Sequence, residues 1–149
     1  MVRFLWVWGG NGLIFLVSAW AFWRGGRTER LGAAFIALAW IVTPFVQTHG
    51  IVGLDLGTTG VDLLLLIGLT WLSLSSRELW ALLASASQLL CVIGHFASAL
   101  SNNIGMFTYV TGNGFWGGYM LILALAIGMI GAERRRREEK IASTAAGHG

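Results

Sequence analysis

The chain has few charged residues, a single cysteine and a single proline. Charged side chains make up 11% of its 149 residues and hydrophobic ones 56%, whereas soluble domains carry about a quarter charged residues. Such a chain cannot cover a surface that faces water. We therefore predict a small integral membrane protein. Its length leaves little room for a soluble domain once several spans of about 20 residues are counted.

Motifs for catalysis are also missing. The lone Cys91 excludes an intrachain disulfide and a cysteine-based metal site. No nucleophile stands at motif spacing from a base, no glycine-rich phosphate loop follows a strand, and no paired acidic motif occurs. We predict that the protein is not an enzyme, and the sequence indicates no particular cofactor or metal.

What the sequence does contain is a set of five apolar runs. They predict an all-α membrane protein, a bundle of five transmembrane helices within residues 1–132. The expected spans are 4–23, 31–49, 61–76, 79–100 and 113–132. Residues 133–149 are expected to form a charged helical extension followed by a disordered tail, because Glu133 with Arg137 and Arg134 with Glu138 are favourable i,i+4 pairs.

Basic residues occur in alternate breaks between the runs. "RGGRTER", "SSRE" and "ERRRREEK" contain them, whereas "GIVGLDLGTTG" and "SNNIGMFTYVTG" do not. Lys and Arg concentrate in cytoplasmic loops, so we predict an outside N-terminus and a cytoplasmic C-terminus. This topology explains the pI of 9.8 better than nucleic-acid binding, which we do not expect. The consecutive arginines Arg134, Arg135, Arg136 and Arg137 are expected to meet lipid headgroups.

One alternative concerns the first run. The tripeptide "AWA" at 19–21 fits the small-x-small pattern of signal-peptide cleavage, and removal of residues 1–23 would leave four spans. The bulky "FWRGGR" that follows is a poor start for a mature chain, so we favour retention of the first helix.

Small residues indicate which helix faces pack. In lipid, helices associate through small side chains and interhelical hydrogen bonds. The fourth run has the richest pattern, which predicts a central helix in the bundle. The expected packing residues are Gly9, Gly10, Gly12, Ala84, Ser87, Cys91, Gly94, Ser98, Ala124 and Gly128.

Polar side chains inside the apolar runs are the candidate site residues. They are Asn11, Gln47, His49, Asp62, Gln88 and His95. At a rise of about 1.5 Å per residue, all but Gln88 fall in the outer third of a core about 30 Å thick. One interpretation is an outward-facing pocket with Asp62 and His95 as its titratable pair. A second makes Asp62 a helix cap and His95 an interhelical hydrogen-bonding group. A third is a metal or haem site.

The tripeptide Gly-Asn-Gly occurs at 10–12 and again at 112–114. We predict different roles for the two copies. Asn113 should lie at the outer surface and cap the fifth helix. Asn11 should lie within the hydrocarbon, where the adjacent glycines admit a neighbouring helix and Asp62 or His95 is the expected partner.

The segments "RGGRTERLGA", "TPFVQ" and "QLLCVIGH" resemble small multi-pass inner-membrane proteins of Gram-negative bacteria that have no assigned activity. The resemblance implies a bacterial inner (plasma) membrane location and no site.

Small size and short loops predict a non-catalytic accessory or assembly subunit of a larger inner-membrane complex, with other membrane subunits or further copies of itself as partners. The alternative is a small transport or ligand-binding protein, including one that holds a pigment or haem, with its pocket around Asp62 and His95.

Overall fold

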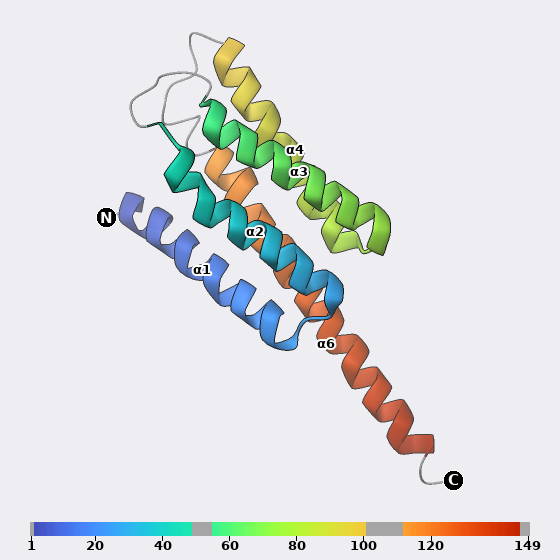
Figure 1. The fold of residues 1–149 in the computed structure, drawn as a ribbon. Coiled ribbons are helices and arrows are strands. Elements are labelled where there is room, and N and C mark those ends of the chain that lie inside the picture. The colour runs from blue at the N-terminus through green and yellow to red at the C-terminus, as the bar shows by residue number, and fades with distance from the viewer. Residues whose placement is uncertain (1, 49–54, 101–111, 147–149) are drawn as a thin grey trace.

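The computed structural model describes residues 2–48, 55–100 and 112–146, with side chains described from Gly9 onward. These residues form a helical bundle, and no strand occurs among them. The helices are α1 (Val2–Arg24), α2 (Arg27–Val46), α3 (Leu56–Ser76) and α4 (Leu79–Leu100), then a π-helical turn η1 (Phe115–Tyr119) that runs into α6 (Met120–Ala146) (Figure 1). The predicted site residue His49 lies outside the described residues.

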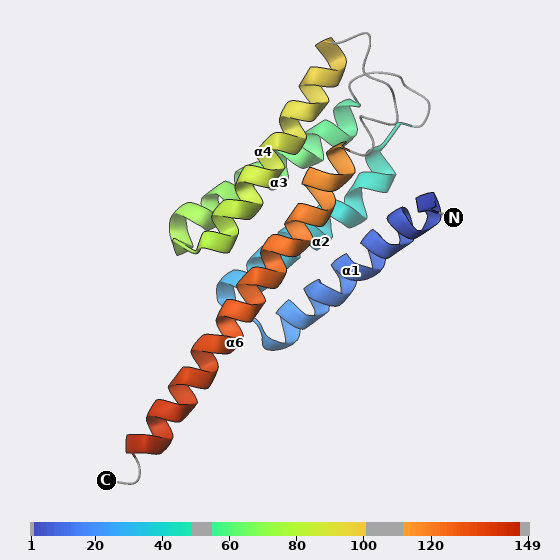
Figure 2. The ribbon, with the colours of Figure 1, turned by 180° about the vertical axis from the view of Figure 1, so that it is seen from behind.

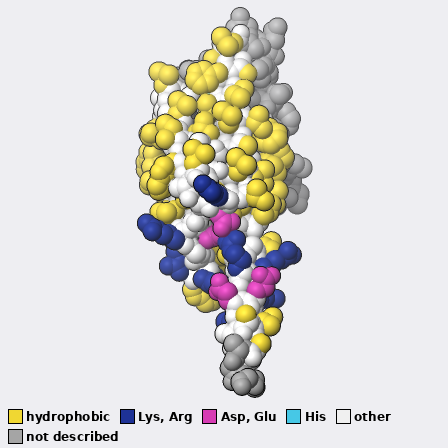
Figure 3. All heavy atoms as spheres, turned by 90° about the vertical axis from the view of Figure 1, so that its right-hand side faces the viewer, with side chains coloured by type: hydrophobic (Ala, Val, Ile, Leu, Met, Phe, Trp, Pro, Cys, Tyr) yellow, Lys and Arg dark blue, Asp and Glu magenta, His cyan; other side chains and the backbone are white. Residues whose placement is uncertain are grey.

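Four of the described helical segments are long and apolar enough to cross a membrane: α2, α3, α4 and the continuous helix from Gly112 that includes η1 and α6. The first helix is also long, at 23 residues. Large apolar side chains cover the outside of the bundle, and Leu100 is 88% exposed. Figure 3 shows this apolar surface above a zone of charged side chains, at the end from which α6 projects. These features are those of a membrane protein.

The helices pack in a ring. Each of α1, α2, α3 and α4 contacts the next, and α6 closes the ring against α4 and α1 while also touching α2 (Figures 1 and 2). The sequence predicts that the helix at 79–100 is central. It is the most buried of the four spanning segments, but α6 contacts a larger number of different helices.

Trp80 fills the space that two glycines leave. Its ring lies against Gly32 of α2 and Gly128 of α6, and a Cβ atom at Gly128 would lie 2.7 Å from Trp80 Cγ. Ala84, Ser87, Cys91 and Ala124 are buried in the same bundle. In the first helix, a Cβ atom at Gly10 would lie 3.4 Å from the Tyr119 hydroxyl oxygen, whereas one at Gly9 or Gly12 would have no described atom within 4 Å. The close approach predicted there therefore involves Gly10 alone.

The third helix begins earlier than the predicted residue 61. Asp55 is its N-cap: Oδ1 accepts hydrogen bonds from the backbone N–H groups of Gly57 (3.0 Å) and Thr58 (3.3 Å), and Oδ2 accepts one from Thr48 (2.9 Å). The interpretation of Asp62 as this cap is wrong, because Asp62 lies inside the helix. With 21 residues, α3 is long enough to span.

We predict that the Asp55 cap makes stability depend on acid. Burial acts to raise the pKa of Asp55, but hydrogen bonds from Thr58, Thr48 and Gly57 outweigh it and the pKa is lowered from 3.8. A lowered folded-state pKa means that the stabilisation is present above pH 3.8 and is lost as the pH falls through the folded-state value. Thermal unfolding of the wild type should therefore lose more stability on acidification than that of Asp55→Asn, which keeps an uncharged cap. Equal losses in the two proteins would contradict this.

Ion pairs connect α6 to the other helices at the charged end. Glu133 bonds Arg24 of α1 at 2.9 Å, instead of pairing with Arg137 as the sequence suggests. Arg135 contacts the buried Glu29 and also Glu78, both at 3.3 Å. The helix continues to Ala146, so most of the tail predicted to be disordered is helical. Within this helix, Arg134, Arg136 and Arg137 are exposed.

Candidate functional site

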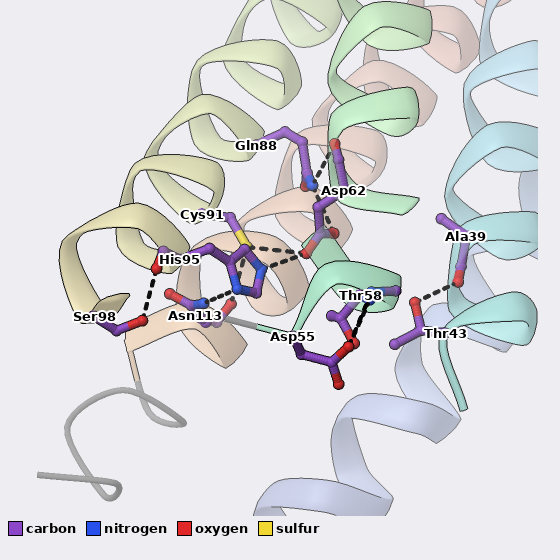
Figure 4. A network of polar contacts seen from close by, with 11 residues as sticks. Ala39, Thr43, Asp55, Thr58, Asp62, Gln88, Cys91, His95, Ser98 and Asn113 are labelled. Atoms are coloured by element: carbon purple, nitrogen blue, oxygen red, sulfur yellow. Dashed lines mark hydrogen bonds and ion pairs between the residues drawn. The ribbon is translucent and has the colours of Figure 1, made fainter. Parts of the chain in front are cut away.

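Polar side chains from three segments meet inside the bundle (Figure 4). Asp62 comes from α3 and Asn113 from the helical residues just before η1. Gln88, Cys91 and His95 come from α4, where spacings of three and four residues put them on one face. That face is turned toward α3 and η1, which are the neighbours of α4 at this level.

The Asp62 carboxylate is the centre of the cluster. Its Oδ2 lies 2.7 Å from His95 Nε2, and its Oδ1 accepts a 2.8 Å hydrogen bond from Gln88 Nε2. The side chain of His95 is 3% exposed and that of Asp62 is 16% exposed. An ionisable pair at this depth is costly unless it is paired and hydrogen-bonded. Asp62 has both kinds of partner.

Cys91 and Asn113 complete the cluster. Cys91 Sγ lies 3.8 Å from Asp62 Oδ2 and 3.9 Å from His95 Nε2. On the other side of the ring, Asn113 Nδ2 lies 3.3 Å from His95 Nδ1. All five side chains are therefore connected through the imidazole and the carboxylate.

Glycines make this close approach possible. A Cβ atom at Gly117 would lie 2.6 Å from Cys91 Sγ, and one at Gly94 would overlap the side-chain oxygen of Asn113. Gly117 belongs to the π-helical turn η1. Such turns insert an extra residue into a helix and often occur at functional sites. Here the turn brings Gly117, which has no side chain, against Cys91 of α4.

A cavity of about 320 Å³ opens beside the cluster. Its walls come from α2, α3, α4 and the start of the last helix. The polar groups that line it are Trp40, Thr43, Gln47, Thr58, Asp62, Cys91, His95 and Asn113, and the apolar lining includes Ile36, Pro44, Leu65 and Leu121. The lining of the cavity is therefore partly polar and partly apolar.

The structure brings some of the predicted site residues together and separates others. Asp62, Gln88 and His95 are in direct contact, and Gln47 lines the same cavity. Asn11 is not in the cluster. Its Oδ1 accepts a 2.6 Å hydrogen bond from Trp40 Nε1, so the predicted partners Asp62 and His95 are wrong.

Sequence reasoning missed two members of the cluster. Cys91 stands at the right spacing from Gln88 and His95, but its small size led us to expect a packing role only. Asn113 was expected to cap a helix at the surface, and it instead contacts the His95 ring. Nothing in the local sequence points to that contact, because it depends on how η1 docks against α4.

Aspartate, histidine and cysteine together suggest a nucleophilic triad, but the geometry argues against it. In a triad the acid and the nucleophile contact opposite nitrogens of the imidazole. Here Asp62 Oδ2 and Cys91 Sγ both approach Nε2, while Nδ1 faces Asn113. The nitrogen that would take the thiol proton already bonds the carboxylate. The arrangement is therefore poorly suited to activating Cys91.

The same geometry suits the binding of a positive charge. One oxygen, one sulfur and one nitrogen atom, from Asp62, Cys91 and His95, lie within 4.8 Å of one another. A carboxylate in a medium of low dielectric attracts cations strongly. No protein family, curated protein or solved structure matches the chain.

Proposed function

We propose that the chain is a small multi-pass membrane protein that binds a small cationic or hydrogen-bonding ligand in the cavity beside Asp62, as a binding or transport protein without catalysis. The observation that carries the proposal is the Asp62 carboxylate. It stands within an apolar bundle and lines a cavity of about 320 Å³. Ionisable residues at such depth commonly mark the path of an ion, a proton or a ligand.

Spare hydrogen-bonding capacity beside the cavity supports the proposal. Gln88 Oε1 and Thr58 Oγ1 are buried and have no hydrogen-bond partner among the described residues. Buried polar groups are nearly always satisfied, by protein, by water or by a ligand. Thr58 lines the cavity, and Gln88 bonds the carboxylate that faces it. A bound polar molecule would supply the missing partners.

The ligand is proposed to enter from outside the cell. The α1–α2 and α3–α4 connections, which carry arginines, lie at the end from which α6 projects (Figure 1). The bias of basic residues assigns this end to the cytoplasm. The cavity is lined instead by the C-terminal part of α2 and the N-terminal part of α3. The bacterial inner membrane is the location that the sequence resemblance implies.

Retention of residues 1–23 is part of the same proposal. Ile14, Ser18 and Ala21 of α1 are buried against the bundle, and Asn11 bonds Trp40, whose ring lines the cavity. Removal of α1 would uncover this side. A mature protein that begins after Trp23 would overturn this part, and N-terminal sequencing of the purified protein is the measurement.

The cavity favours ligand binding over the accessory-subunit role predicted from size and short loops. That role requires a partner surface, whereas the exposed apolar side chains of the described helices are equally suited to lipid. Native mass spectrometry after mild detergent extraction distinguishes the two, since an accessory subunit is recovered with its partner.

Labelling of Cys91 tests the binding proposal directly. Cys91 is the single cysteine and it lines the cavity, so any thiol label reports on that space. We expect the cationic aminoethyl methanethiosulfonate to react faster than the anionic sulfonatoethyl reagent by at least about tenfold, after correction for their rates with a free thiol. Unit charges about 6 Å apart interact by about 3 kcal/mol at an effective dielectric near 20. This energy exceeds the roughly 1.4 kcal/mol that a tenfold ratio of rates requires.

The controls follow from the contacts. Asp62→Asn should bring the two corrected rates close together, whereas Asp55→Asn, at a surface cap, should leave the ratio unchanged. Labelling should be faster when the reagent is added on the side opposite the arginine-rich extension. The binding proposal fails if the folded protein is labelled from neither side, or if the two reagents react equally with the wild type.

A further inference from the structure

We infer that Asp62, Cys91 and His95, which line the cavity, are the protein ligands of a divalent transition-metal ion such as Zn²⁺. The inference rests on the proposed function, because it names the class of ligand that the cavity takes. The three donor atoms are a carboxylate oxygen, a thiol sulfur and an imidazole nitrogen. Mixed sets of this kind are typical ligands of Zn²⁺ and of related borderline ions.

The distances between the donor atoms are close to those of a tetrahedral site. With metal bonds of about 2.0 Å to N and O and about 2.3 Å to S, donors lie about 3.3–3.6 Å apart. In the structure the oxygen–nitrogen distance is 2.7 Å and the two distances from sulfur are 3.8 and 3.9 Å. Side-chain movements of less than about 1 Å would accommodate the ion. The Asp62–His95 pair opens as the ion takes the place of the proton between Oδ2 and Nε2. Cys91 closes in as a thiolate, and the displaced protons are released to solvent.

The three ligands lie on two helices that pack against each other. Cys91 and His95 stand one turn apart on α4, an i,i+4 spacing that puts two ligands on one helix face. Asp62 reaches them from α3, the helix that shares an extensive interface with α4. Gly117 keeps the side of Cys91 free of any side chain. Preorganised ligands on packed helices favour a metal site over a loose polar contact.

An unpartnered oxygen beside the donors is an independent indication. Gln88 is fully buried at 0% exposure, and its Oε1 has no hydrogen-bond partner among the described residues. Its Nε2 is held by Asp62 Oδ1, so the amide cannot turn to satisfy the oxygen without losing that bond. A Cβ at Gly117 would lie 2.6 Å from Cys91 Sγ and 3.9 Å from Gln88 Oε1, which puts both atoms around one small space. A metal ion or its bound water would supply the partner.

The outer contacts of the imidazole also fit. A neutral histidine that binds metal through Nε2 carries its proton on Nδ1 and needs an acceptor there. Asn113 lies at this position, 3.3 Å away. The Asn113 amide would then be turned so that its oxygen, and not its nitrogen, faces Nδ1. The oxygen and nitrogen of an amide have similar shapes, so the orientation is assigned from the hydrogen bonds that the amide makes.

The single cysteine led us to exclude a cysteine-based metal site from the sequence, while a metal or haem site on the histidines stayed open as an alternative. That exclusion applies to sites built from several cysteines. It does not apply to a mixed site whose other ligands come from elsewhere on α4 and from α3, and the fold creates that combination.

Cobalt binding to the untagged, detergent-purified protein tests the inference. Because Cys91 is the single cysteine, a thiolate-to-Co²⁺ charge-transfer band in the near ultraviolet reports on this site alone. We expect the wild type to show the band, and added Zn²⁺ to abolish it by displacement. Cys91→Ser should lose the band while keeping the fold. Asp62→Asn and His95→Asn should each weaken Co²⁺ binding at least about 100-fold, and Asn113→Ala by about 10- to 100-fold.

The outcomes separate the metal inference from the proposed function. If folded wild type shows no band with excess Co²⁺ while Cys91 labelling keeps its preference for the cationic reagent, the metal inference is wrong and ligand binding stands. If the band is absent and Cys91 is unreachable, both are wrong. A band that persists at full affinity in Asp62→Asn and His95→Asn would show sulfur binding alone and overturn the three-ligand site. Asp55→Asn serves as the matched carboxylate control and should bind Co²⁺ like the wild type.

Discussion

Replacement of Asp62 by alanine is expected to lower the free energy of unfolding by about 3 kcal/mol or more, because removal of one partner of a buried pair leaves the other without compensation. His95 is 3% exposed, and Gln88 would lose its side-chain acceptor while keeping the longer bond to the backbone carbonyl of residue 62. Alanine at His95 should be destabilising for the same reason. The double variant should cost clearly less than the sum of the two single ones, since the second change removes a group that is already unpaired.

Denaturant unfolding in detergent micelles, followed by tryptophan fluorescence, is the measurement. Asp55→Ala is the control, because it removes a carboxylate that caps a helix at the surface and should cost only about 1 kcal/mol. Additive effects of the two single substitutions would mean that the 2.7 Å contact between Asp62 and His95 contributes nothing to stability. In that case the network in Figure 4 would not be what holds α3 and α4 together at this level.

Replacement of Gly128 by alanine is the second large effect that we expect. The new Cβ would lie 2.7–2.8 Å from three atoms of the Trp80 ring. That ring is rigid, and Cη2 and Cζ3 at its far edge lie against Gly32, so it has little room to move. Overpacking of this kind costs about 1–3 kcal/mol, more than the roughly 1 kcal/mol that alanine gains over glycine within a helix.

Gly131 on the same helix is the matched control. Its nearest neighbour would be the end of the flexible Arg135 side chain, at 3.9 Å. Gly131→Ala should therefore leave the midpoint of thermal unfolding unchanged or raise it, whereas Gly128→Ala lowers it. Trp80→Leu should remove most of the difference between Gly128 and Gly128→Ala, because the clashing ring is gone. If both alanine variants behave alike, Trp80 is not packed between Gly32 and Gly128.

Glycines bring the helices of the bundle close together at two levels. At one level they pack around the large apolar ring of Trp80, and at the other they pack around the polar cluster. Gly32 and Gly128 accept Trp80, while Gly94 and Gly117 accept Asn113 and Cys91. Close packing is what stabilises helices in lipid, where burying leucine against leucine gains little. The polar cluster thus depends on the same small residues that hold the fold together.

Much of the fold can be predicted from the sequence because it depends on local properties. Span length and apolar composition identify the helices, and the 3.6-residue period identifies the face of the fourth helix that carries Ala84, Gln88 and His95. The charged extension after Ile130 is equally local. The start of α3 was misplaced because the glycine-containing "GLDLGTTG" resembles a loop. Asp55 nevertheless caps a helix that begins at Leu56.

Only part of the candidate site can be predicted from the sequence. Asp62 and His95 stand out because ionisable residues are rare in apolar runs. Their contact, and the entry of Cys91 and Asn113, depend on how each helix is rotated and how far it is shifted along its neighbour. Asn11 shows the same limit: its residue type predicts an interhelical hydrogen bond, but Trp40 as the partner does not follow from it.

The sequence by itself determined that the chain is helical and apolar, and where most of its spans lie. It also identified the polar side chains that are unusual within apolar spans. Only the tertiary structure decided which of those side chains meet. In lipid the apolar surfaces of helices are nearly interchangeable, so helix register is set by small-residue contacts such as Trp80 against Gly32 and Gly128. Those contacts join residues far apart in the chain, and no local pattern encodes them.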